Sequence, residues 1–427
     1  MTTLLMLLGL LALIAINVPI AVALGVVALV AIVLAGGSDA LLGSMITFYG
    51  GATGFPLIAI PLFVLAGAIM NTSGISRRLI AFASALIGFI RGGLAMVNVA
   101  ASLFFAEISG SAVADVAALG SILIPSMKKK GYTPEFTAAV TSSSASLAII
   151  IPPSIPMILY AALADTSVVQ LFVAGIVPGL IGGALMMGLC YWFAVRLNFP
   201  AEEVFQLRRL WVTFKDAAWA LTLPVIILGG IFGGLVSPTE AAGLAVLTAL
   251  FIGAFVYREL DLRLLRSAMI EGAVQTAVVM LLVATSAMLG AYLTEARLPQ
   301  QLAAWIAGIT NEKVLILAML NLLFFVLGFF LHGAAAIILV VPVVLPIVKQ
   351  AGIDLVHFGL IVTLNLAIGQ QTPPVASVLI TACSIARADV WAVTRVNVYF
   401  VAVLIAVLLL VTYVPSAVLW PVELFFR

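Results

Sequence analysis

Charge is what this sequence has least of. Only 8% of its 427 residues are charged, and the formal net charge is +2. A soluble chain of this length needs far more charge to cover its surface, and a nucleic-acid-binding chain needs a basic face. The composition therefore excludes an ordinary soluble protein and predicts no nucleic-acid partner.

Motifs for catalysis and nucleotide binding are also missing. No lysine follows a glycine, which excludes the phosphate-binding loop of an ATP-driven pump. His332 and His357 lie far apart, and no H-E-x-x-H motif is present. Cys190 and Cys383 lie in apolar runs, which predicts buried thiols rather than a disulfide or a zinc site. We therefore expect a protein that is not an enzyme and holds no cofactor.

What the sequence has in abundance is hydrophobic residues, which make up 64% of the chain. A membrane-spanning helix needs about 20 mostly apolar residues, and such stretches recur along almost the whole length. The pattern predicts an all-α polytopic protein, embedded in the lipid bilayer with roughly ten to twelve spans.

An internal repeat organises these stretches. A shift of 221 residues superimposes residue types that are scarce in apolar helices: Pro125 on Pro346, Lys128 on Lys349, Gly131 on Gly352, and Pro152-Pro153 on Pro373-Pro374. Slightly upstream the shift becomes 223, which superimposes Asn98 on Asn321. An ordered set of this kind predicts two structural repeats, with a two-residue difference in length between them.

Each copy follows the same plan. Two apolar runs of about 13–17 residues, too short to cross a bilayer, meet at a tip, at 107–115 in the first copy and at 330–336 in the second. Such a pair predicts a re-entrant hairpin. A helix broken by the Pro-Pro pair follows, at 136–162 and at 357–385. Interrupted segments in corresponding positions of two halves are typical of a transporter's binding site.

The chain thus divides into five parts. We expect scaffold spans at 1–76 and 217–296, transport elements of the first repeat at 77–195, and transport elements of the second repeat with a last span at 297–427. Residues 196–216 are expected to form an amphipathic helix at the membrane surface, because apolar side chains from 204 to 214 share one helical face. A solvated loop is the alternative.

The few charges indicate how the two copies lie in the membrane. Basic residues dominate from 70 to 135, whereas the matching part of the second copy carries acids and bases together. An excess of Lys and Arg marks the cytoplasmic side, so the copies are expected to be inverted, with the first hairpin entering from the cytoplasm. Elsewhere, Ser237-Pro238-Thr239-Glu240 predicts a helix start in which Glu240 completes a capping box. An ion-ligand role for Glu240 is the alternative.

The breaks predict two cation sites, because a broken helix frees carbonyl groups that can bind sodium and nearby hydroxyls add ligands. The first site would use Ser109, Ser111 and the carbonyls around Ala148 and Ile151. The second would use Gly333, Gly369 and Thr372, of which Gly369 and Thr372 match Ala148 and Ile151 at the 221-residue shift. Tightly packed kinked helices are the alternative interpretation.

The same tips suit an anionic substrate, since backbone N–H groups at helix ends attract negative charge. A small carboxylate is expected to contact Ser109, Pro153, Ser154, His332, Gly333, Thr372 and Pro373. Glu107 and Asp115 flank the first tip and are candidate functional acids, although Asp115 fits a helix cap equally well. His332 could titrate or donate to substrate, and a packed structural histidine fits equally well.

At these residues the chain resembles the large membrane subunit of tripartite ATP-independent periplasmic (TRAP) transporters, of the dicarboxylate-transport type in the ion transporter superfamily. The similar stretches are ISGSAVADVAALGSILIPSMKKKGY (108–132), IIPPSIPMILY (150–160), GIVPGL (175–180), SPTEAAG (237–243) and Gln371-Thr372-Pro373-Pro374. The resemblance covers essentially the whole chain.

The resemblance implies a multi-pass protein of the bacterial inner membrane that takes up an organic acid with sodium, by an elevator-like movement of the hairpin domain against a scaffold. It also implies two partners, a small four-helix membrane subunit and a soluble periplasmic substrate-binding protein. The sodium ligands of the family cluster at the positions of Ser109, Ser111, Ala148, Ile151, Gly333, Gly369 and Thr372.

One position departs from the family, whose members often carry Asp or Glu where this chain has His332. Proton involvement through His332 is a hypothesis that this difference raises. A cation/proton antiporter remains the alternative function, although its charged core is missing, together with a stand-alone sodium/carboxylate symporter of the same superfamily.

Overall fold

The computed structural model describes residues 6, 8–10, 12–13, 16, 18–37, 39–109, 111–199, 205–329, 331, 333–373 and 376–426. Within this part every regular element is a helix. Among the described residues, seven helices are long and apolar enough to cross a membrane, and the shorter apolar helices there have 10–17 residues. The difference from the expected ten to twelve spans arises because breaks divide several apolar stretches into pieces.

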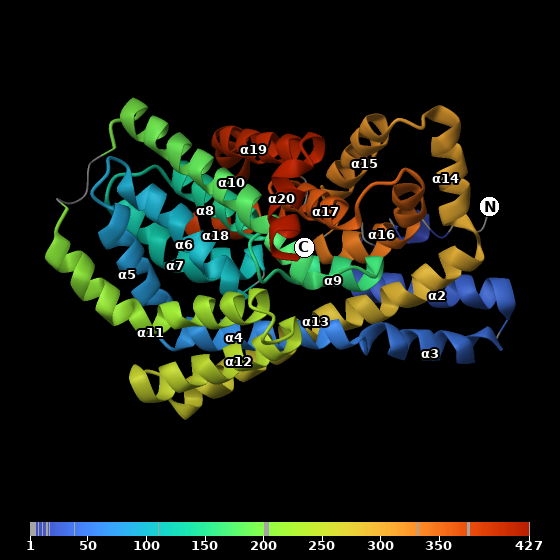
Figure 1. Ribbon diagram of the computed structural model, residues 1–427, viewed down its shortest axis with the longest axis horizontal. Coiled ribbons are helices and arrows are strands. Elements are labelled where there is room, and N and C mark those ends of the chain that lie inside the picture. Colours follow the sequence, from blue (N-terminus) through green and yellow to red (C-terminus); the bar gives the residue numbers. More distant parts are fainter. Residues whose placement is uncertain are drawn as a thin grey trace.

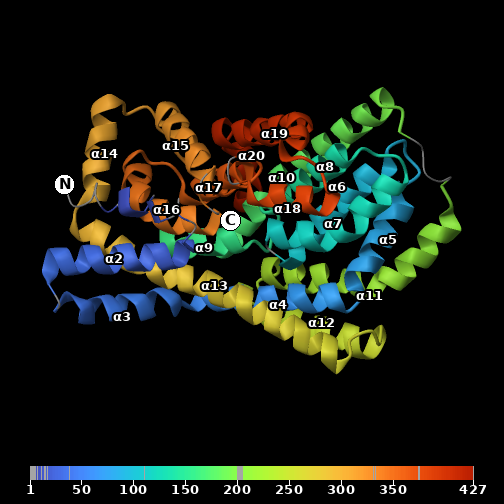
Figure 2. The ribbon, with the colours of Figure 1, turned by 180° about the vertical axis from the view of Figure 1, so that it is seen from behind.

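One group of helices comes from the predicted scaffold ranges. It comprises α2 (Ile20–Gly36), α3 (Ala40–Ala52), the 3₁₀ helix η1 (Phe55–Ile58), α4 (Ala59–Thr72), α11 (Leu207–Phe232), α12 (Pro238–Phe251), the π-helix η2 (Ile252–Val256) and α13 (Leu262–Glu295). The 34-residue α13 packs against α2, α3 and α4, and α12 packs on α4. Figures 1 and 2 show α2, α3, α4, α12 and α13 along one long edge of the molecule.

The predicted repeats supply the other helices. The first contributes α5 (Ile75–Ile87), α6 (Gly93–Ser109), α7 (Ala112–Lys129), α8 (Pro134–Ala148), α9 (Ile155–Ala164) and α10 (Val168–Arg196). The second contributes α14 (Leu298–Ile309), α15 (Lys313–Gly328), α16 (Gly333–Gln350), α17 (Leu355–Gly369), α18 (Ser377–Ala386) and α19 (Val390–Tyr413), followed by α20 (Ser416–Phe426).

Helix order and length match between the two sets. Both α7 and α16 have 18 residues, both α8 and α17 have 15, and both α9 and α18 have 10. Helix α8 begins at Pro134 and α17 begins at Leu355, 221 residues later. The same shift relates their last residues, Ala148 and Gly369. The inverted orientation of the two copies stays a prediction.

The two sets interlock at the centre of the molecule. Helix α9 of the first packs against α16 of the second, and α18 of the second packs against α7 and α8 of the first (Figures 1 and 2). Every residue of α8 from Phe136 and every residue of α17 from Val356 is buried. The C-terminal ends of α8 and α17 therefore lie inside the protein. Non-helical backbone at membrane depth is tolerated where it is buried in protein in this way.

Local sequence signals explain where the helices begin. The Thr133 hydroxyl accepts a hydrogen bond from the backbone N–H of Phe136 at 3.3 Å, and the Asp354 carboxylate accepts one from His357 N–H at 2.9 Å. Such side chains satisfy backbone donors that a helix start leaves unpaired. The capping box at Ser237 and Glu240 is confirmed, with both reciprocal bonds present. Cys190 and Cys383 are buried free thiols, as their apolar surroundings predicted.

The structure differs from the sequence prediction after α10. Residues 196–216 were expected to form a separate surface helix, but α11 runs without interruption from Leu207 to Phe232. Its first ten residues carry the amphipathic pattern, with Leu207 and Trp211 exposed, and the apolar span follows directly. No helix breaker separates the two patterns, so the helix continues. Residues 201–204 lie outside the described part.

Candidate functional site

The first break follows the last residue of α8. Three successive backbone N–H groups, those of Ile149, Ile150 and Ile151, bond to carbonyls three residues earlier, and the last of these bonds joins Ile151 to Ala148 at 3.0 Å. This tightened turn ends the helix, because Pro152 and Pro153 have no N–H to continue it. The next helix begins at Ile155, with the buried Ser154 as its N-cap. The chain thus places a helix C-terminus and a helix N-terminus side by side.

The second break repeats this geometry. The Thr372 N–H bonds to the Gly369 carbonyl at 3.0 Å, which matches the Ile151–Ala148 bond 221 residues earlier. The Thr372 hydroxyl donates to the Ile368 carbonyl at 3.2 Å and is half-buried. Pro373 is also half-buried, while Pro374 lies outside the described residues. Carbonyl and hydroxyl oxygens therefore gather at the second break.

Each hairpin lies against the break of its own half. Leu103 of α6 packs against Ala148 and Ile151. In the second half, Gly333 at the start of α16 lies so close to Gln370 that a Cβ atom on it would be 3.0 Å from Gln370 Nε2. The structure thus shows one contact between each predicted hairpin and its break, and the assembly of each cation site from the predicted residues stays a prediction.

Two glycines allow close backbone packing at the second break. A Cβ atom on Gly369 would lie 2.4 Å from the Gly328 Cα atom, so the ends of α15 and α17 touch through bare backbone. Real Cβ atoms do not approach other atoms this closely. The absence of side chains at Gly328 and Gly369 therefore has a packing reason.

The hairpin tips are described in part. Ser111 is the N-cap of α7, and Asp115 is buried in the first turn of that helix, where a carboxylate is favoured by the helix dipole. The backbone of α6 extends to Ser109, but the side chains of Glu107 and Ser109 lie outside the described part. His332 lies outside the described residues as well. The roles expected for these three residues stay predictions.

Sequence reasoning missed a set of buried polar residues in α8. Thr141, Ser142, Ser143, Ser144 and Ser146 are all fully buried. The hydroxyls of Thr141, Ser142 and Ser144 donate to carbonyls of α8 itself. The run also contacts α6, since Asn98 Nδ2 donates to Thr141 Oγ1 at 2.6 Å and the Ser102 and Ser144 hydroxyls lie 2.8 Å apart. Five hydroxyls within six residues of an apolar segment were the available signal. Buried polar groups need partners, and a helix supplies some of them from its own carbonyl groups, so the run indicates a buried polar face but not which helices it contacts.

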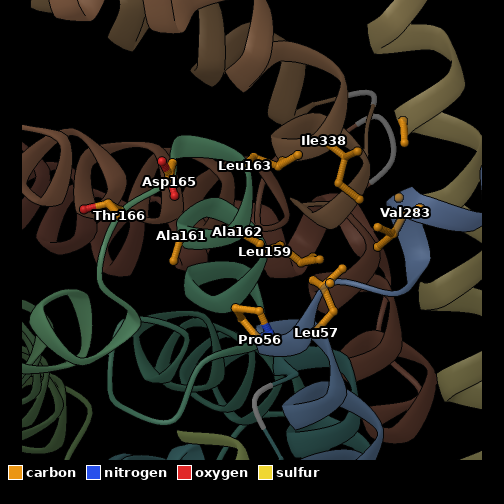
Figure 3. A pocket seen from close by; sticks show the side chains of 14 residues that line it. Pro56, Leu57, Leu159, Ala161, Ala162, Leu163, Asp165, Thr166, Val283 and Ile338 are labelled. Atoms are coloured by element: carbon orange, nitrogen blue, oxygen red, sulfur yellow. The ribbon is translucent and has the colours of Figure 1, made fainter. Parts of the chain in front are cut away.

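Two cavities separate the transport elements from the scaffold helices. The larger, about 670 Å³, lies between α7 and the helices α4 and α13, and both Ser111 and Ile155 line it. The smaller, about 390 Å³, lies between α9 and α16 on one side and α3 and α13 on the other. Figure 3 shows Leu159, Ala162 and Asp165 of the first repeat facing this space, with Val283 and Leu57 across it.

A charged cluster ties α5 to the scaffold outside the apolar spans. Arg78 donates to Glu259 at 2.8 Å and to Asp216 at 3.3 Å, and its guanidinium lies 3.8 Å from the centre of the Tyr257 ring. The hydrogen bond from Arg78, with the charges of Arg78 and Arg77, holds the pKa of Glu259 below its usual range. In the described part of the chain, no group of three His, Cys, Asp or Glu side chains could hold a metal ion.

Comparison with known proteins places this arrangement in a family. Residues 7–417 match the model of the tripartite ATP-independent periplasmic transporter DctM component. The chain is 40% identical over 402 residues to the isethionate TRAP transporter permease of Oleidesulfovibrio alaskensis, which covers 94% of this chain and 63% of that longer protein. It is 39% identical to the C4-dicarboxylate TRAP transporter large permease of Pseudomonas aeruginosa, over 85% of each chain.

A further sequence relative and a solved structure are also similar to this chain. The 2,3-diketo-L-gulonate TRAP transporter large permease of Escherichia coli is 36% identical over 88% of this chain and 89% of its own length. Among solved structures, the YdaH transporter of Alcanivorax borkumensis superimposes with a TM-score of 0.58 over 88% of both chains. Its sequence is 17% identical, so this likeness concerns the fold alone.

Proposed function

Because the chain belongs to the DctM component family of tripartite ATP-independent periplasmic transporters, we propose that it carries a small organic acid across the membrane with sodium as the coupling ion. The chain is a large permease subunit of the bacterial inner membrane and not an enzyme. Our proposal concerns the coupling to sodium, the class of substrate and the elevator-like movement of the repeats.

The observation that carries sodium coupling is the matched pair of breaks. At each one a buried helix ends in a tight turn, bonded from Ile151 to Ala148 in the first half and from Thr372 to Gly369 in the second. The carbonyl groups at a helix C-terminus carry partial negative charge and exceed the available donors. Unwound carbonyls of this kind bind sodium in transporters, so two sites are proposed.

The proposed substrate is a small organic anion. Helix α9 begins directly after the first break, α16 begins at Gly333 beside Gln370, and Ser111 at the start of α7 lines the same cavity as Ile155. Helix N-termini present backbone N–H groups that favour negative charge. The relatives named above carry isethionate, C4-dicarboxylates or 2,3-diketo-L-gulonate according to their names, and all of these are organic acids. Ser154, Thr372 and Pro373 are the described residues best placed to contact such a group.

The proposed partners are a small membrane subunit and a soluble periplasmic receptor. The isethionate relative has a name that combines two permease components and a length well beyond this chain, which supports a second membrane subunit. The proposed movement carries the interlocked repeats past α3, α4 and α13. Two cavities lie between the repeats and the scaffold, at neighbouring positions along α13, and they support such a movement because they leave space at this interface.

The test is sodium-dependent uptake into vesicles that contain this chain with its membrane partner and the soluble receptor. We expect uptake to require an inward sodium gradient and the receptor. Thr372→Val should raise the half-saturating sodium concentration about tenfold, because losing one oxygen ligand to a cation costs about 1.4 kcal/mol or more. Ser109→Ala should act in the same direction at the first site.

Thr381→Val is the matched control. Thr381 is half-buried in α18, and its hydroxyl bonds to the Ser377 carbonyl at 2.8 Å, within its own helix and not to a candidate sodium ligand. It should leave sodium dependence unchanged at similar protein abundance. Uptake by the unmutated protein without a sodium gradient would contradict the coupling, and uptake without the receptor would favour an antiporter or a stand-alone symporter.

A further inference from the structure

One buried side chain connects the two breaks directly. Gln371 stands immediately before Thr372 at the second break and is 1% exposed. Its amide nitrogen Nε2 donates to the Ser142 carbonyl at 2.7 Å and lies 2.5 Å from the Ser146 hydroxyl oxygen. Both acceptors belong to α8, whose last turn forms the first break. A residue of the second repeat is thus fastened to the helix that presents the first candidate cation site.

A second side chain closes this connection into a ring. Asn397 of α19 donates through Nδ2 to Gln371 Oε1 at 3.2 Å and to the Gln371 carbonyl at 3.4 Å. Its Oδ1 atom accepts from the Ser143 hydroxyl at 2.7 Å. Asn397 is 1% exposed, and the serines are fully buried. Hydrogen bonds in such a dry, satisfied network are strong, and breaking one leaves a costly unpaired group.

The ring is not a by-product of the repeat. The 221-residue shift places Ile150 where the second copy has Gln371, and Ile150 cannot make side-chain hydrogen bonds. The counterparts of Ser143 and Ser146 are Leu364 and Ala367, whose side chains have no polar group. The hydrogen bonds that join the second break to α8 therefore have no equivalent between the first break and α17, and the internal repeat does not explain them.

We infer that Gln371 is a positioning residue that couples the occupancy of the two candidate sodium sites, an inference that rests on the proposed function. A cation bound at Gly369 and Thr372 fixes the backbone at the second break, and with it the adjacent Gln371. The amide then holds Ser142 and Ser146, and so the last turns of α8 before Ala148. Coupling of this kind is reciprocal, so a cation at the first site favours binding at the second.

The experiment is a sodium titration of uptake in vesicles that contain the complete transporter. Two coupled sites predict a sigmoidal dependence on sodium, with a Hill coefficient above 1 and at most 2 for two sites. Gln371→Met keeps the length of the side chain but removes its hydrogen bonds. We expect its Hill coefficient to fall toward 1 and its half-saturating sodium concentration to rise by about fivefold or more.

Two further variants separate coupling from stability. Ser146→Ala removes one acceptor and leaves the Ser142 carbonyl. It should therefore lower the Hill coefficient by a smaller amount than Gln371→Met and disturb the fold less. Ser102→Ala is the control, because it removes an equally buried bond to Ser144 of the same helix without touching Gln371. It should leave the Hill coefficient unchanged.

The outcomes are distinct. A wild-type Hill coefficient of 1 overturns the coupling. So does an unchanged coefficient in Ser146→Ala or in folded Gln371→Met, or an equal fall in Ser102→Ala. Wild-type uptake that needs no sodium instead contradicts the proposed function itself. Sodium-dependent thermal shifts of the purified complex give the same comparison without transport, because ligand binding stabilises the folded state.

Discussion

At the scale of single residues, the glycines at the second break do what no other residue could. Gly369 and Gly328 bring two helix ends into backbone contact, and Gly333 leaves room for Gln370. Ala148 occupies the position of Gly369 in the first half and packs against a leucine instead. The second site therefore depends on close backbone approach, whereas the first depends on side-chain packing.

Gly369→Ala should destabilise the protein because the new Cβ atom would lie 2.4 Å from Gly328 Cα, and an overpacked core costs about 1–3 kcal/mol. Thermal unfolding of the purified protein in detergent measures the effect. Gly290→Ala in α13 is the control, since nothing lies within 4 Å of its added Cβ atom. It should be neutral or stabilising by up to about 1 kcal/mol, and equal destabilisation of both variants would refute the packing explanation.

Single residues also mark the limit of prediction from sequence. Ala148, Ile151, Gly369 and Thr372 could be placed because prolines next to them interrupt apolar helices, which is a local signal. The partnership of Gln371 with Ser142 could not, because it joins positions 229 residues apart. A serine in a helix bonds readily to its own backbone, so the run in α8 did not by itself indicate a partner.

At the scale of elements, Arg78 joins three pieces of structure. It belongs to α5, Asp216 belongs to α11, and Glu259 lies in the segment between η2 and α13. Its side chain is 15% exposed, whereas that of the neighbouring Arg77 is 67% exposed. Arg78 should therefore supply most of the stabilisation that this cluster gives to the packing of α5 against the scaffold.

Glu259→Gln should lower stability in a pH-dependent way. The folded-state pKa of Glu259 is depressed, so its contribution is present above the ordinary value of 4.5 and is lost as the pH falls through the folded value. Thermal unfolding at pH 7 should show a loss below about 1 kcal/mol, since the pair is partly exposed. The difference from wild type should shrink as the pH falls below 4.5, and Arg78→Gln should lower stability more than Arg77→Gln.

Element boundaries were predicted well where breakers and caps fix them. Both broken helices and the capping box follow from proline, glycine and Ser/Thr/Asp positions that act within a few residues, whereas the re-entrant hairpins stay a prediction. The junction within α11 was predicted wrongly, because a change from amphipathic to apolar pattern does not end a helix. The hydrophobic periodicity of a helix indicates which of its faces are buried, whereas prolines, glycines and capping residues determine where the helix ends.

At the scale of the whole molecule, the interlocked repeats present different faces to the scaffold. Ser121 of α7 is exposed beside the larger cavity, and Ala162 of α9 is exposed beside the smaller one. Helix α13 borders both cavities, so a movement of the repeats along it would enlarge one space and close the other. The proposed elevator movement therefore predicts that the solvent exposure of Ser121 and that of Ala162 change in opposite directions.

Cysteine labelling tests this directly. Ser121→Cys and Ala162→Cys would be treated separately with a membrane-impermeant thiol reagent, with and without sodium and receptor-bound substrate. The native Cys190 and Cys383 are buried and should contribute little background. We expect labelling of one position to rise at least about twofold while the other falls, because a rigid movement exchanges their exposure. Changes in the same direction, or none during active uptake, would mean that the repeats do not move as a unit past α13.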